Sequence, residues 1–232
     1  MGTKTNVGAS SEIEPAMQEM VQLMDSRANV YKVLSRAFRV EMDKRFASDL
    51  AQDLVFESSS SELASAFRSM VESIDGIDED GLEQMAVVFD RVFFGMGPIT
   101  ARHAFPYESV YTSEKGIMMQ EAYSQVVRAY REQKLAKDEA FTEPEDHIAV
   151  ELAFMATLAE RSAAFLREDH EEAAEQTVIQ QLAFAKEHLL NWVDIFCADL
   201  AAAADGSFYE HLATFTAAFV KEDAAVLEDI LD

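Results

Sequence analysis

Glycine and proline are scarce in this chain of 232 residues, which contains 8 Gly and 4 Pro. Sandwiches and barrels need a turn about every 8–12 residues, and Gly and Pro are the residues that most often make such turns. Their scarcity disfavours an all-β fold and favours a mostly helical one. Most of the glycines and prolines lie between Gly76 and Pro144, so we expect the irregular part of the chain there.

Cysteine is almost absent, because Cys197 is the one cysteine in the sequence. A single cysteine excludes an internal disulfide and any metal site built from several cysteines. Its apolar neighbours Phe196 and Leu200 predict a buried, unreactive thiol rather than a nucleophile. The sequence also has no G-x-x-x-x-G-K-[ST] phosphate loop and no G-x-S-x-G turn. A P-loop enzyme is therefore excluded, and covalent catalysis has no candidate residue.

Positive charge is in short supply, with 19 Lys and Arg against 43 Asp and Glu and a formal net charge of −24. Nucleic-acid binding depends on clustered Lys and Arg that neutralise phosphates, so a DNA- or RNA-binding role is disfavoured. Residues 138–232 contain 22 acidic and 4 basic residues. This acidic part suits a basic partner, and it equally suits solubility or a salty medium.

Long apolar runs are missing as well. The longest stretch without a charged residue is about ten residues, whereas a membrane-spanning helix needs about 18. The first residues are small and polar and do not contain the apolar core of a secretion signal. The sequence therefore predicts a soluble, cytoplasmic protein without a membrane span.

Apolar residues recur at steps of three and four through most of the chain, which is typical of helices with one buried face. No segment alternates apolar and polar residues over the length of a strand. The predicted fold class is all-α, a helical bundle of about 9–11 helices. A charged hinge near 136–143 divides an N-terminal helical subdomain, 1–137, from an acidic C-terminal helical subdomain, 138–232, within one compact unit. The predicted helices cover about 12–40, 47–56, 61–74, 82–93, 113–135, 144–166, 170–204 and 208–231.

Residues 95–112 have the least helical composition, and such irregular segments carry binding more often than packing. The helix after the hinge has a clear start signal. Thr142 or Glu143 can cap it, Pro144 is tolerated in its first turn, and Glu145 completes an S/T-x-x-E box. The 11 Met and 16 Phe are interpreted mainly as core, although methionines also line adaptable peptide-binding surfaces.

The residues best suited to chemistry are Asp146, His147 and Glu151. His147 and Glu151 are four residues apart, so they share a helix face and could share a proton or a metal. A helical metal site usually needs a second such pair, and none has the right spacing here. A structural interpretation stays open, in which Asp146 binds free N–H groups at the helix start and His147 is hydrogen-bonded to hold the hinge.

Residues 143–155 read Glu-Pro-Glu-Asp-His-Ile-Ala-Val-Glu-Leu-Ala-Phe-Met. This segment resembles the E-P-x-D-H-x-x-x-E-L-x-F-M signature of the TorD/DmsD family, the redox enzyme maturation chaperones related to nitrate reductase delta subunits. Arg91-Val-Phe-Phe-Gly95 is similar to the family's R-L-F-x-G, and Pro106-Tyr-Glu-Ser-Val-Tyr111 to its P-x-x-S-V-Y. The resemblance covers about residues 25–220 and includes Gln181, His188, Trp192 and the pair Phe208-Tyr209.

The resemblance implies a TorD-like fold of two helical subdomains joined by the hinge. It also implies a chaperone without catalytic activity, metal or cofactor of its own, whose partners are a twin-arginine signal peptide and the apo-form of a molybdopterin oxidoreductase. Such a chaperone assists maturation and cofactor insertion before export. Some relatives exchange domains to form dimers, so the resemblance also allows a homodimer. Two alternatives stay open, a nitrate-reductase-delta-like assembly factor acting on the enzyme body and a metalloenzyme using His147 and Glu151.

By position, the resemblance makes Asp146 and His147 the leading signal-peptide-binding residues, with Pro144 and Glu151 supporting the hinge helix. The chain departs from the family pattern at Phe93, where Leu or Tyr is frequent, and at Lys134, where Gly is common. These departures concern the identity of the client enzyme rather than the fold. The other family motifs place six more residues along the same cleft, namely Arg91, Phe94, Gly95, Pro106, Ser109 and Tyr111.

Overall fold

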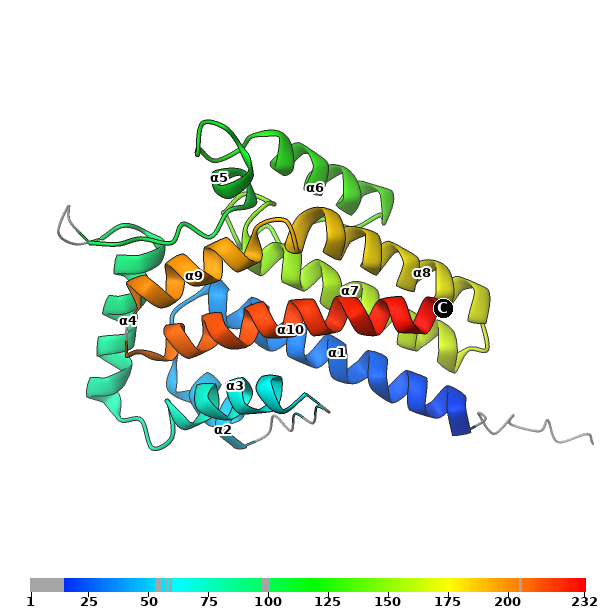
Figure 1. Ribbon diagram of the computed structural model, residues 1–232, viewed down its shortest axis with the longest axis horizontal. Helices are drawn as coiled ribbons and strands as arrows, with labels where there is room; N and C mark the ends of the chain where they lie inside the picture. The colour runs from blue at the N-terminus through cyan, green and yellow to red at the C-terminus, as the bar shows by residue number, and fades with distance from the viewer. Residues whose placement is uncertain (1–14, 53–55, 57, 59, 97–100, 205) are drawn as a thin grey trace, which may run out of the picture.

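The computed structural model describes residues 15–52, 56, 58, 60–96, 101–204 and 206–232. These residues form α-helices and one π-helical turn and contain no strand, which confirms the all-α prediction (Figure 1). None of these helices is long and apolar enough to cross a membrane. The elements are α1 (Pro15–Arg39), α2 (Lys44–Gln52), α3 (Ser61–Glu72), α4 (Glu79–Phe93), α5 (Glu108–Thr112), α6 (Glu121–Glu132), α7 (Ile148–Arg167), α8 (Glu171–Phe184), η1 (Ala185–Leu189), α9 (Val193–Ala203) and α10 (Phe208–Leu231).

Helix α7 is the centre of the bundle. It packs along α1 on one side and α8 on another, while α10 lies against α9, α8 and α3 (Figure 1). Most of its side chains are buried, and Leu152 and Met155 are fully so. A helix that is apolar on nearly all sides can be stable only inside a protein. One continuous apolar core therefore joins residues of both predicted subdomains, and the boundary at 137/138 stays a prediction.

A buried ion pair fastens the first helix to the last. The Arg27 guanidinium donates to both carboxylate oxygens of Asp223, at 2.6 and 2.9 Å, and Tyr31 donates its hydroxyl proton to the same carboxylate at 2.6 Å. Arg27 also donates to Gln181 on α8 at 2.8 Å. Each of these buried charged groups therefore has hydrogen-bond partners, which offset the cost of removing it from water.

Several helix boundaries follow from the capping signals. Ser60 caps α3 and Asp78 caps α4 through their side-chain oxygens, and Gly76 and Gly95 take positive φ angles of 67° after α3 and α4. The described part of α2 runs to Gln52, and the predicted extension through 53–55 lies outside the described residues. Phe56, where that helix was predicted to end, is not helical. The helix start predicted at 12–14 also lies outside the described residues.

Three helix predictions are wrong. The helix predicted for 113–135 begins only at Glu121, because Gly116 and Met119 take left-handed conformations, with φ of 59° and 57°, that interrupt a right-handed helix. The helix predicted for 170–204 is divided into α8, η1 and α9. Helix α7 begins at Ile148 and not at 144, because His147 caps it. The irregular segment 95–112 also contains the short helix α5.

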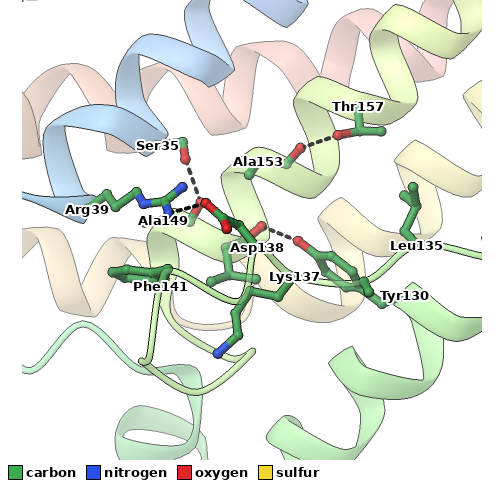
Figure 2. A pocket seen from close by; sticks show the side chains of 12 residues that line it. Ser35, Arg39, Tyr130, Leu135, Lys137, Asp138, Phe141, Ala149, Ala153 and Thr157 are labelled. Atoms are coloured by element: carbon green, nitrogen blue, oxygen red, sulfur yellow. Dashed lines mark hydrogen bonds and ion pairs between the residues drawn. The ribbon is translucent and has the colours of Figure 1, made fainter.

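The hinge lies across the start of α7 and is held by a side chain of α1. Arg39 donates to Asp138 at 2.5 Å, and its guanidinium lies 4.9 Å from the centre of the Phe141 ring. Arg39, Asp138 and Phe141 also line a partly open cavity of about 110 Å³ (Figure 2). Its polar walls are already paired, since Ser35 donates to the Ala149 carbonyl and Tyr130 to the Val150 carbonyl, at 2.7 and 2.6 Å. The cavity therefore offers few free hydrogen-bonding groups to a ligand.

Candidate functional site

The signature residues lie where the segment 104–109 crosses the start of α7. Ile148 donates its backbone N–H to the Pro106 carbonyl at 2.9 Å, and Glu108 donates its own to the Asp146 carbonyl at 2.9 Å. The Asp146 carboxylate then accepts the backbone N–H of Ser109 at 3.1 Å. The structure thus brings together Pro106, Ser109 and Asp146, which sequence reasoning had assigned to one cleft.

Asp146 and His147 are both buried, with 0% and 3% of their surfaces exposed. The Nδ1 atom of His147 accepts the backbone N–H of Ala149 at 3.0 Å, so this imidazole is the N-cap of α7. Its ring packs edge-on against Tyr107 and Phe141. Burial lowers its pKa from 6.5 to about 3, with a further lowering from Lys137, which keeps the ring neutral and able to accept. The hinge is held by this cap, while Asp146 binds an N–H of α5 rather than one of its own helix.

Glu151 lies one turn into α7 and is fully buried. Its Oε2 atom accepts the indole N–H of Trp192 at 3.2 Å, and the same N–H is 2.6 Å from the His188 carbonyl. Tyr111 of α5 stacks on the Trp192 ring at 5.5 Å between ring centres. Glu151 and Tyr111 therefore both contact the Trp192 side chain.

Glu108 is the residue that sequence reasoning missed. It lies at a variable position of the P-x-x-S-V-Y motif, yet it is 1% exposed. Its carboxylate accepts His188 Nδ1 at 3.0 Å and Asn191 Nδ2 at 2.7 Å. Both partners are some 80 residues later in the sequence, at η1 and just after it. The sequence around Glu108 therefore shows only a charged residue within an aromatic motif, which does not reveal its partners.

The junction is unusually acidic for a protein interior. Glu108, Asp146 and Glu151 come together, and no Lys or Arg forms an ion pair with any of them among the described residues. Burial raises the pKa of Asp146, partly offset by its bonds to Ser109. Burial, and then the charges of Glu108 and Asp146, raise the pKa of Glu151 well above its ordinary value. Two buried oxygens, Asp146 Oδ1 and Glu151 Oε1, have no donor.

The remaining predicted residues divide between this junction and the end of α4. Arg91 donates to the Ala203 carbonyl at 3.0 Å and so joins α4 to the end of α9. Gly95 follows α4 in a left-handed conformation beneath the Phe105 ring. Pro144 is partly buried, and its carbonyl accepts the His147 N–H in the turn before α7.

An apolar patch is exposed beside the segment 104–109. Phe94, Met96 and Phe105, here called the Phe94 patch, are 50%, 62% and 40% exposed. Phe94 packs against Phe89 of α4, and Phe105 lies over Gly95. A second exposed group, Ile117, Met118 and Met119, follows α5. Met96, Met118 and Met119 are therefore exposed rather than part of the core.

The geometry does not join His147 to Glu151 as a catalytic or metal pair. The His147 ring faces Tyr107 and Phe141, whereas the Glu151 carboxyl faces Trp192. Within the described ranges, no three His, Cys, Asp or Glu side chains are arranged to hold a metal ion. Cys197 is buried, and burial raises the pKa of its thiol, as expected for an unreactive cysteine.

Comparison with known proteins gives one consistent result. Residues 57–198 match the model of the nitrate reductase delta subunit family. Proteins named Chaperone protein TorD are similar over nearly their whole length. That of Photobacterium profundum is 30% identical (91% of this chain, 98% of the relative), that of Shewanella pealeana 28% (89% and 91%), and that of Vibrio vulnificus strain CMCP6 27% (91% and 99%). The all-helical chain, with its signature at the junction of α5 and α7, therefore belongs to the TorD chaperones of the nitrate reductase delta subunit family, which have a non-enzymatic role in redox enzyme maturation.

Proposed function

We propose that this chaperone binds the twin-arginine signal peptide of a molybdopterin-containing oxidoreductase and assists its maturation and cofactor insertion in the cytoplasm before export. The observation that carries the proposal is the buried Asp146 carboxylate, one oxygen of which has no donor. Guanidinium groups bind carboxylates through short, charge-assisted and often paired hydrogen bonds. A junction with three carboxyl groups and two unpaired oxygens offers the acceptors that an arginine side chain requires.

The surroundings of the junction suit the rest of a leader. An apolar stretch follows the two arginines of such a peptide, and the Phe94 patch is exposed beside the segment that carries Pro106 and Glu108. The excess of acidic residues in 138–232 attracts a basic peptide at long range. Charge and apolar surface thus occur close together on this chain.

Burial of Asp146 implies a movement on binding. The segment 104–109 is fastened to α7 by the bonds at Pro106, Glu108 and Ser109, each worth about 0.5–1.5 kcal/mol net. Opening this fastening is within reach of the binding energy of a peptide. We infer that the arrangement described here is the leader-free, closed form, and that the leader takes over the acceptors that the segment now covers.

The test is leader binding measured by fluorescence anisotropy with a labelled peptide. We expect an Arg-Arg leader to bind at least tenfold more tightly than a Lys-Lys leader, because lysine keeps the charge but loses the paired geometry. Asp146→Asn should weaken Arg-Arg binding to a similar degree with little loss of fold. Asp169→Asn is the matched control, since Asp169 is an exposed loop residue with a φ of 61° that Asn also tolerates. Equal affinities for both leaders, or an unaffected Asp146→Asn, would contradict the proposal.

The match to the nitrate reductase delta subunit model favours one alternative, an assembly factor that acts on the enzyme body. Deleting the leader from a co-expressed client separates the two functions. Capture of the client that survives this deletion supports the alternative, and capture that depends on the leader supports the signal-peptide chaperone.

A further inference from the structure

Exposed methionine sulfur is concentrated in one part of the chain that the structure describes. Met96, Met118 and Met119 are 62%, 39% and 57% exposed, and in sequence they flank the segment 104–109 of the candidate site. The other described methionines are buried or half-buried, namely Met17, Met20, Met24, Met42, Met70, Met85 and Met155. Solutes therefore reach methionine most readily in the two exposed apolar groups.

The loop that carries Met118 and Met119 is joined to the candidate site by hydrogen bonds. The backbone N–H of Gln120 donates to the Ser109 hydroxyl at 3.0 Å, and the backbone N–H of Ser109 donates to the Asp146 carboxylate at 3.1 Å. The Gln120 side-chain amide donates to the Met118 carbonyl at 3.0 Å. These bonds stabilise a loop in which Met119 takes a φ of 57°, a conformation that costs energy for a residue other than glycine. Two methionine side chains are thus left exposed two hydrogen bonds away from Asp146.

Met96 occupies a comparable position in the Phe94 patch. Its backbone N–H donates to the Asp90 carbonyl of α4 at 3.2 Å. The preceding residue, Gly95, lies beneath the Phe105 ring, so Met96 directly follows the point where α4 meets the segment 104–109. Each apolar group beside the candidate site therefore contains exposed sulfur.

Among the apolar side chains of these two groups, only the thioether sulfur reacts readily with a peroxide. A sulfur lone pair attacks one peroxide oxygen, an S–O bond forms and the O–O bond breaks. The departing hydroxide takes the proton of the transferred oxygen and leaves as water, so sulfur loses the two electrons that the peroxide gains. Cys197 does not compete, because its thiol is buried and burial raises its pKa, whereas the thiolate is the reactive form.

We propose that Met96, Met118 and Met119 form a reversible oxidation site, at which a peroxide makes the apolar surface beside the candidate site polar and thereby weakens leader binding. The effect on the leader rests on the proposed function, whereas the oxidation does not. A sulfoxide oxygen that is covered by an apolar stretch loses its hydrogen bonds to water, which disfavours the contact. Methionine sulfoxide reductases, one for each sulfoxide epimer, restore the thioether.

Peptide mapping by mass spectrometry, after timed exposure of the protein to hydrogen peroxide, tests the site. We expect sulfoxide to form roughly tenfold faster at the three exposed methionines than at the fully buried Met24, Met70 and Met155, because oxidation follows exposure. Circular dichroism checks that the treated protein stays folded. Equal rates at exposed and buried methionines in the folded protein would overturn the oxidation site.

Fluorescence anisotropy with a labelled Arg-Arg leader that lacks methionine measures the consequence. The wild type should bind this leader roughly tenfold more weakly after peroxide treatment, the order expected when one buried methionine side chain becomes polar. Treatment with both sulfoxide reductases should restore the affinity. This comparison uses one protein in three states, so it does not depend on the folding of any variant.

Two variants assign the effect, each compared with its own untreated form. The triple variant Met96→Leu, Met118→Leu and Met119→Leu keeps apolar side chains of similar volume without sulfur, and its affinity should not change on peroxide treatment. The matched control is Met17→Leu with Met20→Leu, which removes two half-buried methionines at the start of α1, at the opposite end of the bundle from α4 (Figure 1). This control should lose affinity on treatment as the wild type does.

The remaining outcomes also decide the question. An equal loss of affinity in the triple variant would assign the effect to another group and overturn the inference. An unchanged wild-type affinity after complete oxidation of the three methionines would overturn the inference and leave the proposed function standing. A leader that does not bind the untreated protein contradicts the proposed function and removes the effect on the leader, while the sulfoxide map still decides whether the oxidation site exists.

Discussion

The free protein should become less stable relative to Glu151→Gln as the pH rises. Glu151 is fully buried beside Glu108 and Asp146, and its pKa in the folded state is raised well above the ordinary value of 4.5. A carboxyl group with a raised folded-state pKa stabilises the fold fully below its unfolded-state pKa. This contribution is lost as the pH rises toward the folded-state pKa, because the unfolded chain releases the proton first. The difference in stability between the two proteins therefore begins to change at about pH 4.5 and continues to change as the pH rises toward the folded-state pKa.

The size of the effect follows from one proton. Each pH unit within that range is worth about 1.36 kcal/mol. Over the two pH units between 5.5 and 7.5 the wild type should lose up to about 3 kcal/mol relative to Glu151→Gln, a large share of the 5–15 kcal/mol typical of a domain. Gln at this position does not titrate, has nearly the shape of the protonated acid and keeps an oxygen for the Trp192 N–H, so the difference isolates the proton on Glu151.

Urea unfolding at pH 5.5, 6.5 and 7.5, followed by circular dichroism, measures this difference. Glu175→Gln, which removes an exposed carboxylate of α8, serves as the control and should follow the wild type at every pH. If the wild-type and Glu151→Gln stabilities ran parallel within about 0.5 kcal/mol over this range, Glu151 could not hold a proton in the folded state.

Three further predictions concern the fold, and urea unfolding measures each. Asp223→Ala should cost about 3–5 kcal/mol, since it leaves the Arg27 charge buried without its partner; the double variant with Arg27→Met should recover much of this loss, and no recovery would mean that packing rather than charge dominates. Leu152→Ala should cost about 2–5 kcal/mol because the side chain is fully buried, and a loss below 1 kcal/mol would contradict its central position. His147→Ala should cost about 0.5–2 kcal/mol through the lost cap of α7, whereas His147→Asn, which can cap, should restore part of it.

Local signals predicted the helices well where one residue type decides the outcome. Ser60 and Asp78 precede apolar periodic stretches, and both cap the expected helices. The stretch 113–120 was mistaken for helix because Ile117 and Met118 fit an apolar period. A left-handed Met119 is not visible in sequence, since the conformation depends on tertiary contacts such as the bond from the Gln120 N–H to the Ser109 hydroxyl.

The site shows the same division between local and distant information. The motif residues Pro106, Ser109 and Asp146 could be grouped in advance, because a family pattern had already joined them. Glu108 could not, because its role depends on donors 80 and 83 positions away. Composition shows that acidic residues are abundant. Only the packing of α5 against η1 and α7 determines which of their carboxyl groups are buried.

The π-helical turn η1 has a consequence for how sequences of this kind should be aligned. A π-turn contains one residue more than the α-helical turn it replaces, and a residue corresponds to about 100° of rotation around the helix. Deleting one residue within 185–189 should convert η1 into an ordinary α-helical turn, which completes nearly the same revolution with one residue fewer. Asn191 and Trp192 would then still face Glu108 and Glu151. A deletion inside α8, by contrast, has no extra residue to remove and would rotate everything beyond it by about 100°. In comparing relatives, a one-residue gap in this region should therefore be placed at 185–189, where it keeps two acidic side chains and their donors together.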